Sequence, residues 1–409
     1  MYTIRGIINE VIIGGKVVKT LKNIIFYGTP AYGHINPTLP IVNRLVKNGY
    51  RVVYYATEEF RQQIEACGAE VRVYDFGEIE WNPQIGSHIF KLAELVLRFA
   101  NEQLDMLLSD ARNLKAVLIL HDTIAFWGRA VAEIAGIMAV SVNPIVTVYP
   151  NTRKTLRLYT SRFAGSSLRE VAVLPEIIKM EKELTHRYAL EKQRFLQILM
   201  NEEKFNIFTY PREMHPEGNR MKANAFFLGA SAILRNDTYD TDVDYRYENL
   251  IYVSLGTIFN DSLSFYRAVM EAFGNTEYTV VIACGKHCDE LATEIQQPNI
   301  ILKPYVNQQQ IMKNARLFIT AGGMNSICEA VANGVPCLVH PQQGEQAINA
   351  KVLEGLGLGK VVSKPHRLGT VARDLLNKFQ VNTELQEKFS NVCLDELMDR
   401  IEKYINGGV

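Results

Sequence analysis

The sequence carries no excess of charge of either sign. Its 409 residues contain 44 Lys and Arg against 44 Asp and Glu, which gives a formal net charge of zero. A protein that works mainly on nucleic acid needs a basic surplus to neutralise phosphates, so no nucleic-acid partner is expected. Glycine and proline are few, with 27 and 14 residues, and no heptad or short repeat persists. Collagen-like, disordered and coiled-coil chains are therefore excluded.

Cysteine is sparse, and its spacing fits no common framework. There is no CxxC pair among the six residues, which are Cys67, Cys284, Cys288, Cys328, Cys337 and Cys393. This usage predicts reduced thiols and a cytoplasmic protein. Cys284 and Cys288, with His287 between them, lack the second pair of ligands that a zinc site requires. We interpret them as residues at the end of a strand.

Long apolar runs are also missing. No stretch reaches the roughly 18 to 20 uninterrupted apolar residues of a membrane-spanning helix, so no integral membrane segment is expected. In the first 21 residues, Glu10 and Lys16 interrupt the apolar run and no small-residue cleavage site follows, which argues against a signal peptide. We interpret residues 1–21 as an N-terminal extension.

What the chain does contain is two series of short apolar runs separated by amphipathic stretches. Continuous rather than alternating hydrophobicity is typical of parallel strands covered on both faces. Between the series, residues 231–249 are rich in Asp and lack apolar periodicity, as in an interdomain linker. The sequence thus predicts an α/β protein with two Rossmann-like, doubly wound parallel-sheet domains, 22–230 and 250–382, that face a ligand cleft. The last residues, 383–409, are expected to form a helix that packs back on the first domain.

Two strand ends of the first domain carry candidates for acid–base chemistry. His34 follows the strand 24–29 and precedes Asn36 and Pro37, which predict a helix N-cap and a first helical position. A helix N-terminus nearby keeps an imidazole neutral enough to accept a proton. Asp122 ends another strand and could accept the other imidazole N–H. Two structural alternatives stay open: a turn histidine bonded to backbone, and an aspartate that caps a helix.

A strand of the second domain runs into a glycine pair and a polar helix start, Ala321-Gly322-Gly323-Met324-Asn325-Ser326. Free amides at such a helix start bind anions such as phosphate. Ser326 and Glu329 also fit the S-x-x-E capping box, so a purely structural helix start is the alternative.

Other polar segments are less specific. Glu345 and Gln346 follow a further strand and offer a carboxylate and an amide, the mixture that sugar hydroxyls require. A dinucleotide site is not supported, because the G-x-G-x-G run at 355–359 follows a helix rather than a strand. The basic stretch 151–170 is interpreted as a solvated helical face, with a wall for an amphipathic or anionic acceptor as the alternative.

Five motifs in this order, spanning essentially residues 22–405, resemble the macrolide-type bacterial branch of the UDP-glycosyltransferase superfamily. They are GTPAYGHINPTLP, HDTIAFWG, YVSLGT, PYVNQQQIM and AGGMNS..EA..GVP....PQQGEQ..NA. The resemblance implies the two-domain GT-B fold, with the acceptor against the first domain and the nucleotide-sugar held mainly by the second. It also implies a UDP-sugar co-substrate, a small hydrophobic hydroxylated acceptor such as a macrolide or flavonoid, and no metal or other cofactor. We expect a monomer or weak dimer.

The resemblance also implies roles for individual residues. By position, His34 resembles the base that deprotonates an acceptor hydroxyl, and Asp122 resembles its partner. The deprotonated oxygen would attack the anomeric carbon opposite UDP and invert its configuration. The matched donor positions are Tyr305 for uracil with Val306 and Gln308 nearby, Glu329 for ribose, Ser254 and Thr257 for the diphosphate-side loop, Gly323, Asn325 and Ser326 for the leaving phosphate, and Glu345 and Gln346 for the sugar. Gln346 matches the pattern of glucose-using members.

Ala321 departs from this family pattern, which has His at that position in contact with the donor phosphate. Losing such a charge-assisted contact costs about 1.5–3 kcal/mol of donor binding. The predicted function is an inverting, metal-independent O-glycosyltransferase that moves a sugar, by default glucose, from a UDP-sugar to a hydroxyl. Ala321 favours the alternative of a nucleotide-sugar-binding auxiliary or a low-activity, inactivated transferase. A third possibility, an epimerase of the same fold, lacks its expected acidic pair beside the sugar.

Overall fold

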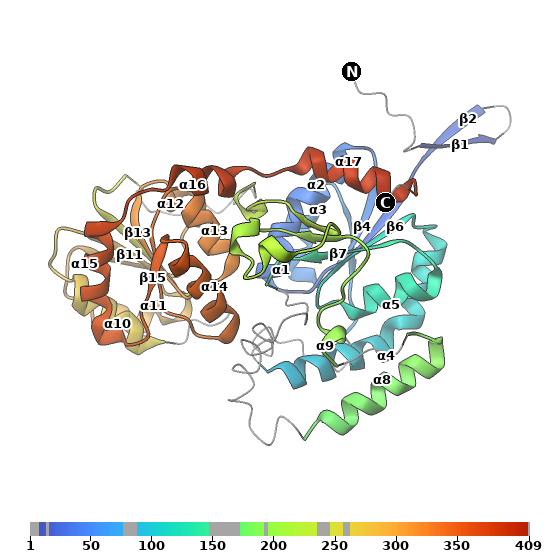
Figure 1. Cartoon of the computed structure of the whole chain (residues 1–409). Coiled ribbons are helices and arrows are strands. Elements are labelled where there is room, and N and C mark those ends of the chain that lie inside the picture. The colour runs from blue at the N-terminus through green and yellow to red at the C-terminus, as the bar shows by residue number, and fades with distance from the viewer. Residues whose placement is uncertain are drawn as a thin grey trace. The chain divides into compact units, whose positions relative to one another are not determined.

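The computed structural model describes residues 8–13, 16–76, 88–146, 172–191, 195–234, 246–256 and 262–407. Thr257 and the basic stretch 151–170 therefore lie outside the described residues, as does 235–245 of the predicted linker. The chain divides into two compact units, each built on its own sheet (Figure 1). The first comprises Met1–Thr209, Met221–Leu228 and Cys393–Val409, and the second comprises Tyr210–Arg220 and Gly229–Val392.

The first unit has a seven-stranded sheet in which every neighbouring pair runs parallel. Its order is β5 (Glu70–Val73), β4 (Arg51–Ala56), β3 (Asn23–Tyr27), β6 (Leu118–Asp122), β7 (Ala139–Asn143), β8 (Asn206–Phe208) and β9 (Ala225–Phe227). Ile24 to Tyr27 in β3 are all fully buried, as expected for a strand covered on both faces. The chain order reverses between β3 and β6, so the carboxyl ends of these two strands flank the topological switch point.

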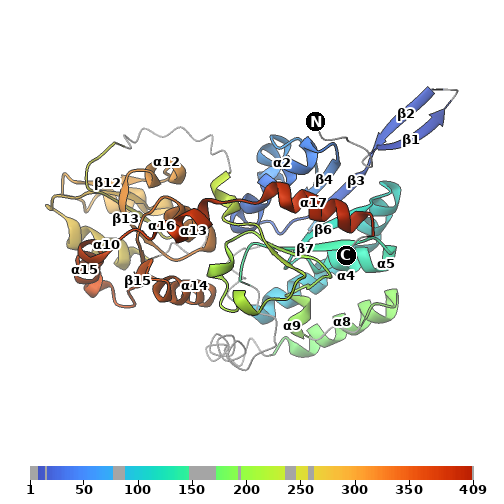
Figure 2. The same cartoon turned by 45° about the horizontal axis from the view of Figure 1, so that its top comes forward.

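Helices cover both faces of this sheet. On one face, α4 (Ile89–Asn113) and α5 (Phe126–Ala135) pack over β3, and α8 (Leu174–Tyr188) lies beside α4 (Figure 1). On the other, α2 (Leu39–Lys47) contacts the C-terminal helix α17 (Leu394–Ile405), as Figure 2 shows. Shorter helices are α1 (Tyr32–Ile35), α3 (Arg61–Glu65) and α9 (Phe195–Ile198).

The chain enters this unit through a hairpin. Strands β1 (Ile8–Ile13) and β2 (Lys16–Leu21) pair antiparallel, and β2 ends two residues before β3 begins. The described part of the predicted N-terminal extension is therefore a two-stranded ribbon rather than part of the seven-stranded sheet.

The second unit has a six-stranded sheet, also with all neighbours parallel. Its order is β12 (Ile300–Lys303), β11 (Thr279–Ala283), β10 (Leu250–Ser254), β13 (Ala315–Thr320), β14 (Cys337–Val339) and β15 (Gly359–Val361). Its switch point lies between β10 and β13. Together the two sheets confirm the predicted class of two doubly wound, parallel α/β domains.

Two helix layers enclose the second sheet. The first consists of α10 (Leu263–Phe273) and α15 (Leu368–Lys378), which pack on Ile251 and Val253 with α11 (Cys288–Ala292) nearby. On the opposite face lie α12 (Gln308–Met312), α13 (Met324–Ala332) and α14 (Gly344–Gly355), and α16 (Thr383–Ser390) packs on α13.

The observed units and the predicted boundaries differ in several segments. Residues 210–220 belong to the second unit although they precede the last strand of the first, and so do residues 383–392 with α16. Only the part from Cys393 onward, with α17, belongs to the first unit. In α17, Leu397, Met398 and Ile401 are buried, and the Tyr404 hydroxyl donates to the carbonyl of Ala139 at 3.1 Å. Within the described ranges, no helix is both long and apolar enough to cross a bilayer.

Candidate active site

His34 and Asp122 meet at the switch point of the first unit. His34 Nδ1 lies 2.8 Å from Asp122 Oδ2, and the two side chains are only 12% and 1% exposed. An ionised carboxylate only accepts hydrogen bonds, so Nδ1 is the donor and Nε2 carries the lone pair of the neutral ring. The geometry is that of a general base oriented by a buried acid. The structure thus joins the two residues that sequence analysis selected for acid–base chemistry.

The helix that carries His34 begins earlier than predicted. The carbonyl of Ala31 accepts from the backbone N–H groups of His34 and Ile35, both at 2.9 Å, so α1 starts at Tyr32 with Ala31 as its N-cap. The predicted N-cap at Asn36 is therefore wrong, because the backbone turns into a helix as soon as it leaves Pro30 and Ala31. His34 lies within this first helical turn rather than in a loop before it.

Both carboxylate oxygens of Asp122 are hydrogen-bonded. Oδ1 accepts from the Thr29 hydroxyl at 2.8 Å and from the backbone N–H of Ile124 at 2.9 Å, while Oδ2 contacts His34. Helix α5 starts only at Phe126, so the alternative that Asp122 caps it is excluded. Sequence analysis missed Thr29. A polar residue at a strand end was the only signal, and nothing local indicates that it faces a residue 93 positions away.

Aromatic packing fixes the end of β3 against β4. The Tyr54 ring lies over Gly28, where an added Cβ would come within 2.6 Å of Tyr54 Cε1. Its hydroxyl is 3.0 Å from that of Thr38, and burial raises the pKa of Tyr54 far above the usual range. This tyrosine therefore stays neutral and acts as a rigid wall beneath the turn that leads to His34.

The glycine pair of the second unit performs two different tasks. Gly322 has φ +94°, and a Cβ there would come within 2.6 Å of Val339 Cγ1, so the turn requires glycine. Gly323 is the N-cap of α13, and a Cβ on it would meet no atom within 4 Å. The N-terminal amides of α13, including those of Asn325 and Ser326, therefore begin beside open space at the carboxyl edge of the sheet, as an anion site requires.

The capping-box alternative for Ser326 and Glu329 is excluded, because Gly323 caps the helix and Ser326 lies inside it. Gln308 instead brings these residues together. Its side-chain amide donates to Glu329 Oε2 at 2.7 Å and lies 3.4 Å from the Ser326 hydroxyl. Glu329 is 1% exposed, so this contact holds a buried carboxylate in the middle of α13.

Tyr305 and Val306 lie in the segment between β12 and α12. Val306 is buried, whereas the Tyr305 side chain is 40% exposed. An exposed aromatic face at the carboxyl edge of a sheet is suited to stacking on a flat base. The neighbouring Asn307 caps α12 by accepting from the N–H of Gln310, which fixes the position of Gln308.

Glu345 and Gln346 lie in the first turn of α14, and their side chains have different hydrogen-bond partners. Gln346 Oε1 accepts from the backbone N–H groups of Gln342 and Gln343, at 2.8 and 3.1 Å, so it caps the helix. Glu345 Oε1 accepts from Asn349 at 3.3 Å, and the same Asn349 amide donates to the carbonyl of Gly322 at 3.1 Å. Sequence analysis missed Asn349, which ties α14 to the glycine turn. Its position four residues after Glu345, on the same helix face, was the available signal.

Ser254 and Ala321 flank the switch point of the second unit. The Ser254 hydroxyl accepts from the N–H of Gly256 at 3.3 Å, and Ser254 pairs in register with Thr320 of β13. Ala321 is 1% exposed and belongs to the apolar core under α10 and α15. The position at which the resembled family has a phosphate-binding histidine is therefore filled here by a core methyl group.

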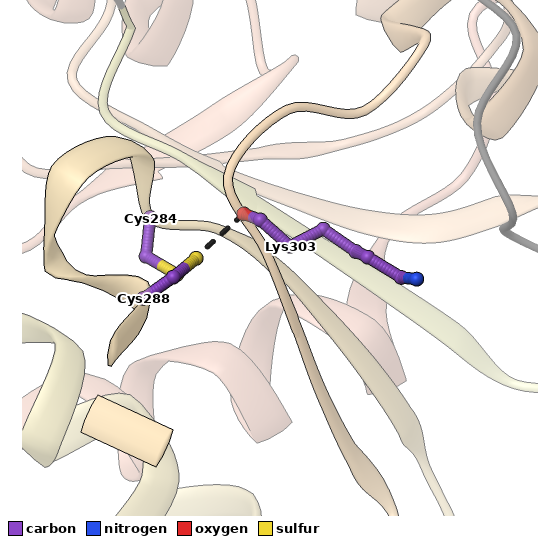
Figure 3. Close-up of a disulfide and its surroundings, with 3 residues drawn as sticks. All are labelled: Cys284, Cys288 and Lys303. Carbon is purple, nitrogen blue, oxygen red and sulfur yellow. Dashed lines mark hydrogen bonds between the residues drawn. A yellow bond between two sulfur atoms is a disulfide. The ribbon is translucent and has the colours of Figure 1, made fainter. Parts of the chain in front are cut away.

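Cys284 and Cys288 form a disulfide, so the expectation of six reduced thiols is wrong (Figure 3). Their Cα atoms are 5.5 Å apart because the short helical turn after β11 folds Cys288 back over the strand end. The four remaining cysteines are free. Cys284 Sγ also lies 3.5 Å from the carbonyl oxygen of Lys303, two residues before Tyr305.

The sulfur atoms of Cys284 and Cys288 are thus bonded to each other rather than to a metal ion. In the part of the chain that the structure describes, no group of three or more His, Cys, Asp or Glu side chains is arranged to hold one.

Comparison with known proteins identifies the family. Residues 258–402 match the glycosyltransferase family 28 C-terminal domain. The chain is 33% identical over 348 residues to the NDP-glycosyltransferase YjiC of Bacillus licheniformis, covering 83% of this chain and 84% of that one. It is 26% identical to the uncharacterized UDP-glucosyltransferase YdhE of Bacillus subtilis, over 94% of this chain and 99% of that one. The crystal structure of the glycosyltransferase of kitacinnamycin superposes with a TM-score of 0.80 at 23% identity, covering 94% and 99% of the two chains.

Proposed function

We propose that this chain is an inverting, metal-independent O-glycosyltransferase. It belongs to the macrolide-glycosyltransferase-like bacterial branch of the UDP-glycosyltransferase superfamily, and it is a glycosyltransferase with the GT-B fold. It moves a sugar, by default glucose, from a UDP-sugar to a hydroxyl of a small hydrophobic acceptor. The contact between His34 Nδ1 and Asp122 Oδ2 at 2.8 Å carries the proposal. A protein that only binds a nucleotide-sugar has no use for a buried acid that orients a histidine.

The reaction begins with the acceptor hydroxyl. Its proton passes to Nε2 of His34, and the resulting imidazolium is stabilised by the Asp122 carboxylate on Nδ1. The oxygen then forms a bond to the anomeric carbon as the bond from that carbon to the UDP phosphate oxygen breaks. Attack from the face opposite the leaving group inverts the configuration.

The second unit supplies the electrophilic assistance. Charge that develops on the departing diphosphate is met by the N-terminal amides of α13 beside Gly323. Tyr305 stacks on the uracil, and the Glu329 carboxylate, held by Gln308, accepts from the ribose hydroxyls. Glu345 and Gln346 contact the sugar. Of these groups, the N-terminal amides of α13 stabilise the departing diphosphate in place of a metal ion, which supports the proposal of a metal-independent reaction.

Apolar side chains around the first switch point favour a hydrophobic acceptor. Phe76 follows β5, Ile145 follows β7, and Ile89 and Phe90 begin α4, so all four lie toward the carboxyl edge of the sheet that carries His34. They are partly buried hydrophobic residues packed against the core of that unit. The names of the similar proteins support this proposal, since one is called a UDP-glucosyltransferase and another is called the glycosyltransferase of kitacinnamycin.

Ala321 remains the observation that favours a low-activity or auxiliary protein. Its burial in the core gives it a packing role, however, and the acid–base pair is complete. Incubating the full chain with UDP-glucose and a panel of phenolic and macrolide alcohols separates the two functions. If the chain is the proposed transferase, we expect a glycoside with the β-configuration, detected by mass spectrometry and by the coupling of its anomeric proton. UDP binding without any glycoside across the panel would favour the auxiliary protein.

A further inference from the structure

We infer that Thr29 is a positioning residue of this active site, which holds Asp122 so that its second oxygen meets His34. The inference rests on the proposed function for its kinetic consequences but not for its geometry. Thr29 follows β3, is 2% exposed, and donates from Oγ1 to Asp122 Oδ1 at 2.8 Å. Nothing in the motifs selected from the sequence assigns a role to this hydroxyl.

The hydrogen bonds around Asp122 divide between its two oxygens. Thr29 Oγ1 and the N–H of Ile124 both bond to Oδ1, which leaves Oδ2 to accept from His34. A carboxylate rotates readily about the bond to its Cβ, because this torsion has only a broad two-fold preference. Two donors on one oxygen, from different directions, fix that rotation and hence the distance from Oδ2 to Nδ1.

Burial makes the threonine hydroxyl difficult to replace. Asp122 is 1% exposed, so bulk water does not reach the carboxylate freely to supply a lost donor. An ionised carboxylate that loses one of its hydrogen bonds in such surroundings bears the cost of its desolvation. The donor must therefore come from a neighbouring side chain, and β3 lies directly beside β6 in parallel register. The pairing that brings His34 to Asp122 also brings Thr29 there.

Thr29→Val and Thr29→Ser form a matched pair of variants. Valine keeps the branched shape and volume but removes the donor, whereas serine keeps the donor and loses only a methyl group. We expect T29V to lower kcat about tenfold with the KM for the UDP-sugar unchanged, and T29S to restore most of that loss. Circular dichroism of both variants confirms that each is folded.

Two further readouts separate positioning from a merely structural role. In a His34→Ala background, T29V should add no further loss, because Thr29 acts through the pair that is already broken. In the resting protein without substrate, the Nδ1 proton of His34 should give a downfield resonance in the proton NMR spectrum. T29V should shift or broaden that resonance and T29S should keep it.

The inference is overturned if T29V leaves both kcat and the His34 resonance as in the wild type, or if it lowers activity equally with and without His34. Because the NMR measurement needs no turnover, it tests Thr29 even if no glycoside is ever detected. A failure of the proposed function and a failure of this inference are thus distinguishable.

Discussion

At the scale of single residues, the site depends on which nitrogen of His34 carries the proton. Asp122 accepts from Nδ1, so the neutral ring has its lone pair on Nε2. In Asp122→Asn, the amide oxygen can still accept from Thr29 and Ile124, but the amide nitrogen then faces Nδ1 and favours the opposite tautomer. We expect kcat to fall about 10²–10⁴-fold with little change in the thermal melting temperature. A steady-state assay with unchanged kcat would contradict the role of Asp122.

A second residue-scale prediction concerns Ala321. His340, directly after the neighbouring strand β14, donates its N–H to the carbonyl oxygen of Thr320, the residue before Ala321, at 2.8 Å, and its ring stacks on Phe265 with ring centroids 4.5 Å apart. Adding another imidazole to a core site that is 1% exposed overpacks it. Ala321→His should therefore lower the free energy of unfolding by about 1–3 kcal/mol, as measured by urea denaturation. Tighter UDP binding with undiminished stability would show instead that the site has room for the histidine.

At the scale of elements, the glycine turn before α13 supplies a matched pair of substitutions. Gly322→Ala forces a residue with a side chain to φ +94° and into Val339, so it should cost at least about 1 kcal/mol of stability. Gly323→Ala adds its methyl group to open space at φ −62°, so stability should change by less than about 0.5 kcal/mol.

For donor binding, in contrast to stability, the larger effect is expected from Gly323→Ala rather than from Gly322→Ala. The methyl group of G323A lies where the diphosphate is proposed to bind, so UDP affinity should fall about tenfold in isothermal titration calorimetry. Unchanged UDP affinity in G323A would mean that the phosphate does not bind at the start of α13.

The turn between β11 and α11 gives a prediction about thiols. With Cys284 bonded to Cys288 and four cysteines free, Ellman's reagent should titrate four thiols in denaturant and six after reduction. In the native protein, burial raises the pKa of Cys337 to about 12 and also that of Cys328, so these two should stay unreactive at pH 8. Six thiols in denaturant before any reductant would contradict the disulfide.

Sequence patterns locate strand ends well but not the neighbours of each strand. His34 and Asp122 could be selected because each follows an apolar run that ends in polar residues. That β3 lies beside β6, and hence that the two side chains meet, depends on a strand order that no local pattern encodes. Thr29 was missed for the same reason, and so was the bond from Asn349 to the carbonyl of Gly322, since these partners lie in other elements. The disulfide was missed because four-residue spacing alone does not show that a helical turn folds Cys288 back over β11.

At the scale of the whole molecule, both units use the same device. Each sheet reverses its strand order once, between β3 and β6 or between β10 and β13, and His34, Asp122, Ser254 and the glycine turn before α13 lie at the carboxyl ends of those strands. Parallel sheets gather their binding groups at such points because the helices that follow diverge to opposite faces there. The proposed base thus lies in one unit and the proposed donor contacts lie in the other. The charge balance noted in the sequence is consistent with this, because a local helix start can hold an anion without a global basic surplus.

The proposed role of His34 as the base can be tested with one variant, His34→Ala, assayed for UDP release from UDP-glucose with an accepted alcohol. We expect kcat to fall at least about 100-fold while the Kd for UDP stays unchanged, because His34 and the proposed donor contacts belong to different units. UDP release that continues at the wild-type, acceptor-dependent rate in His34→Ala would contradict it.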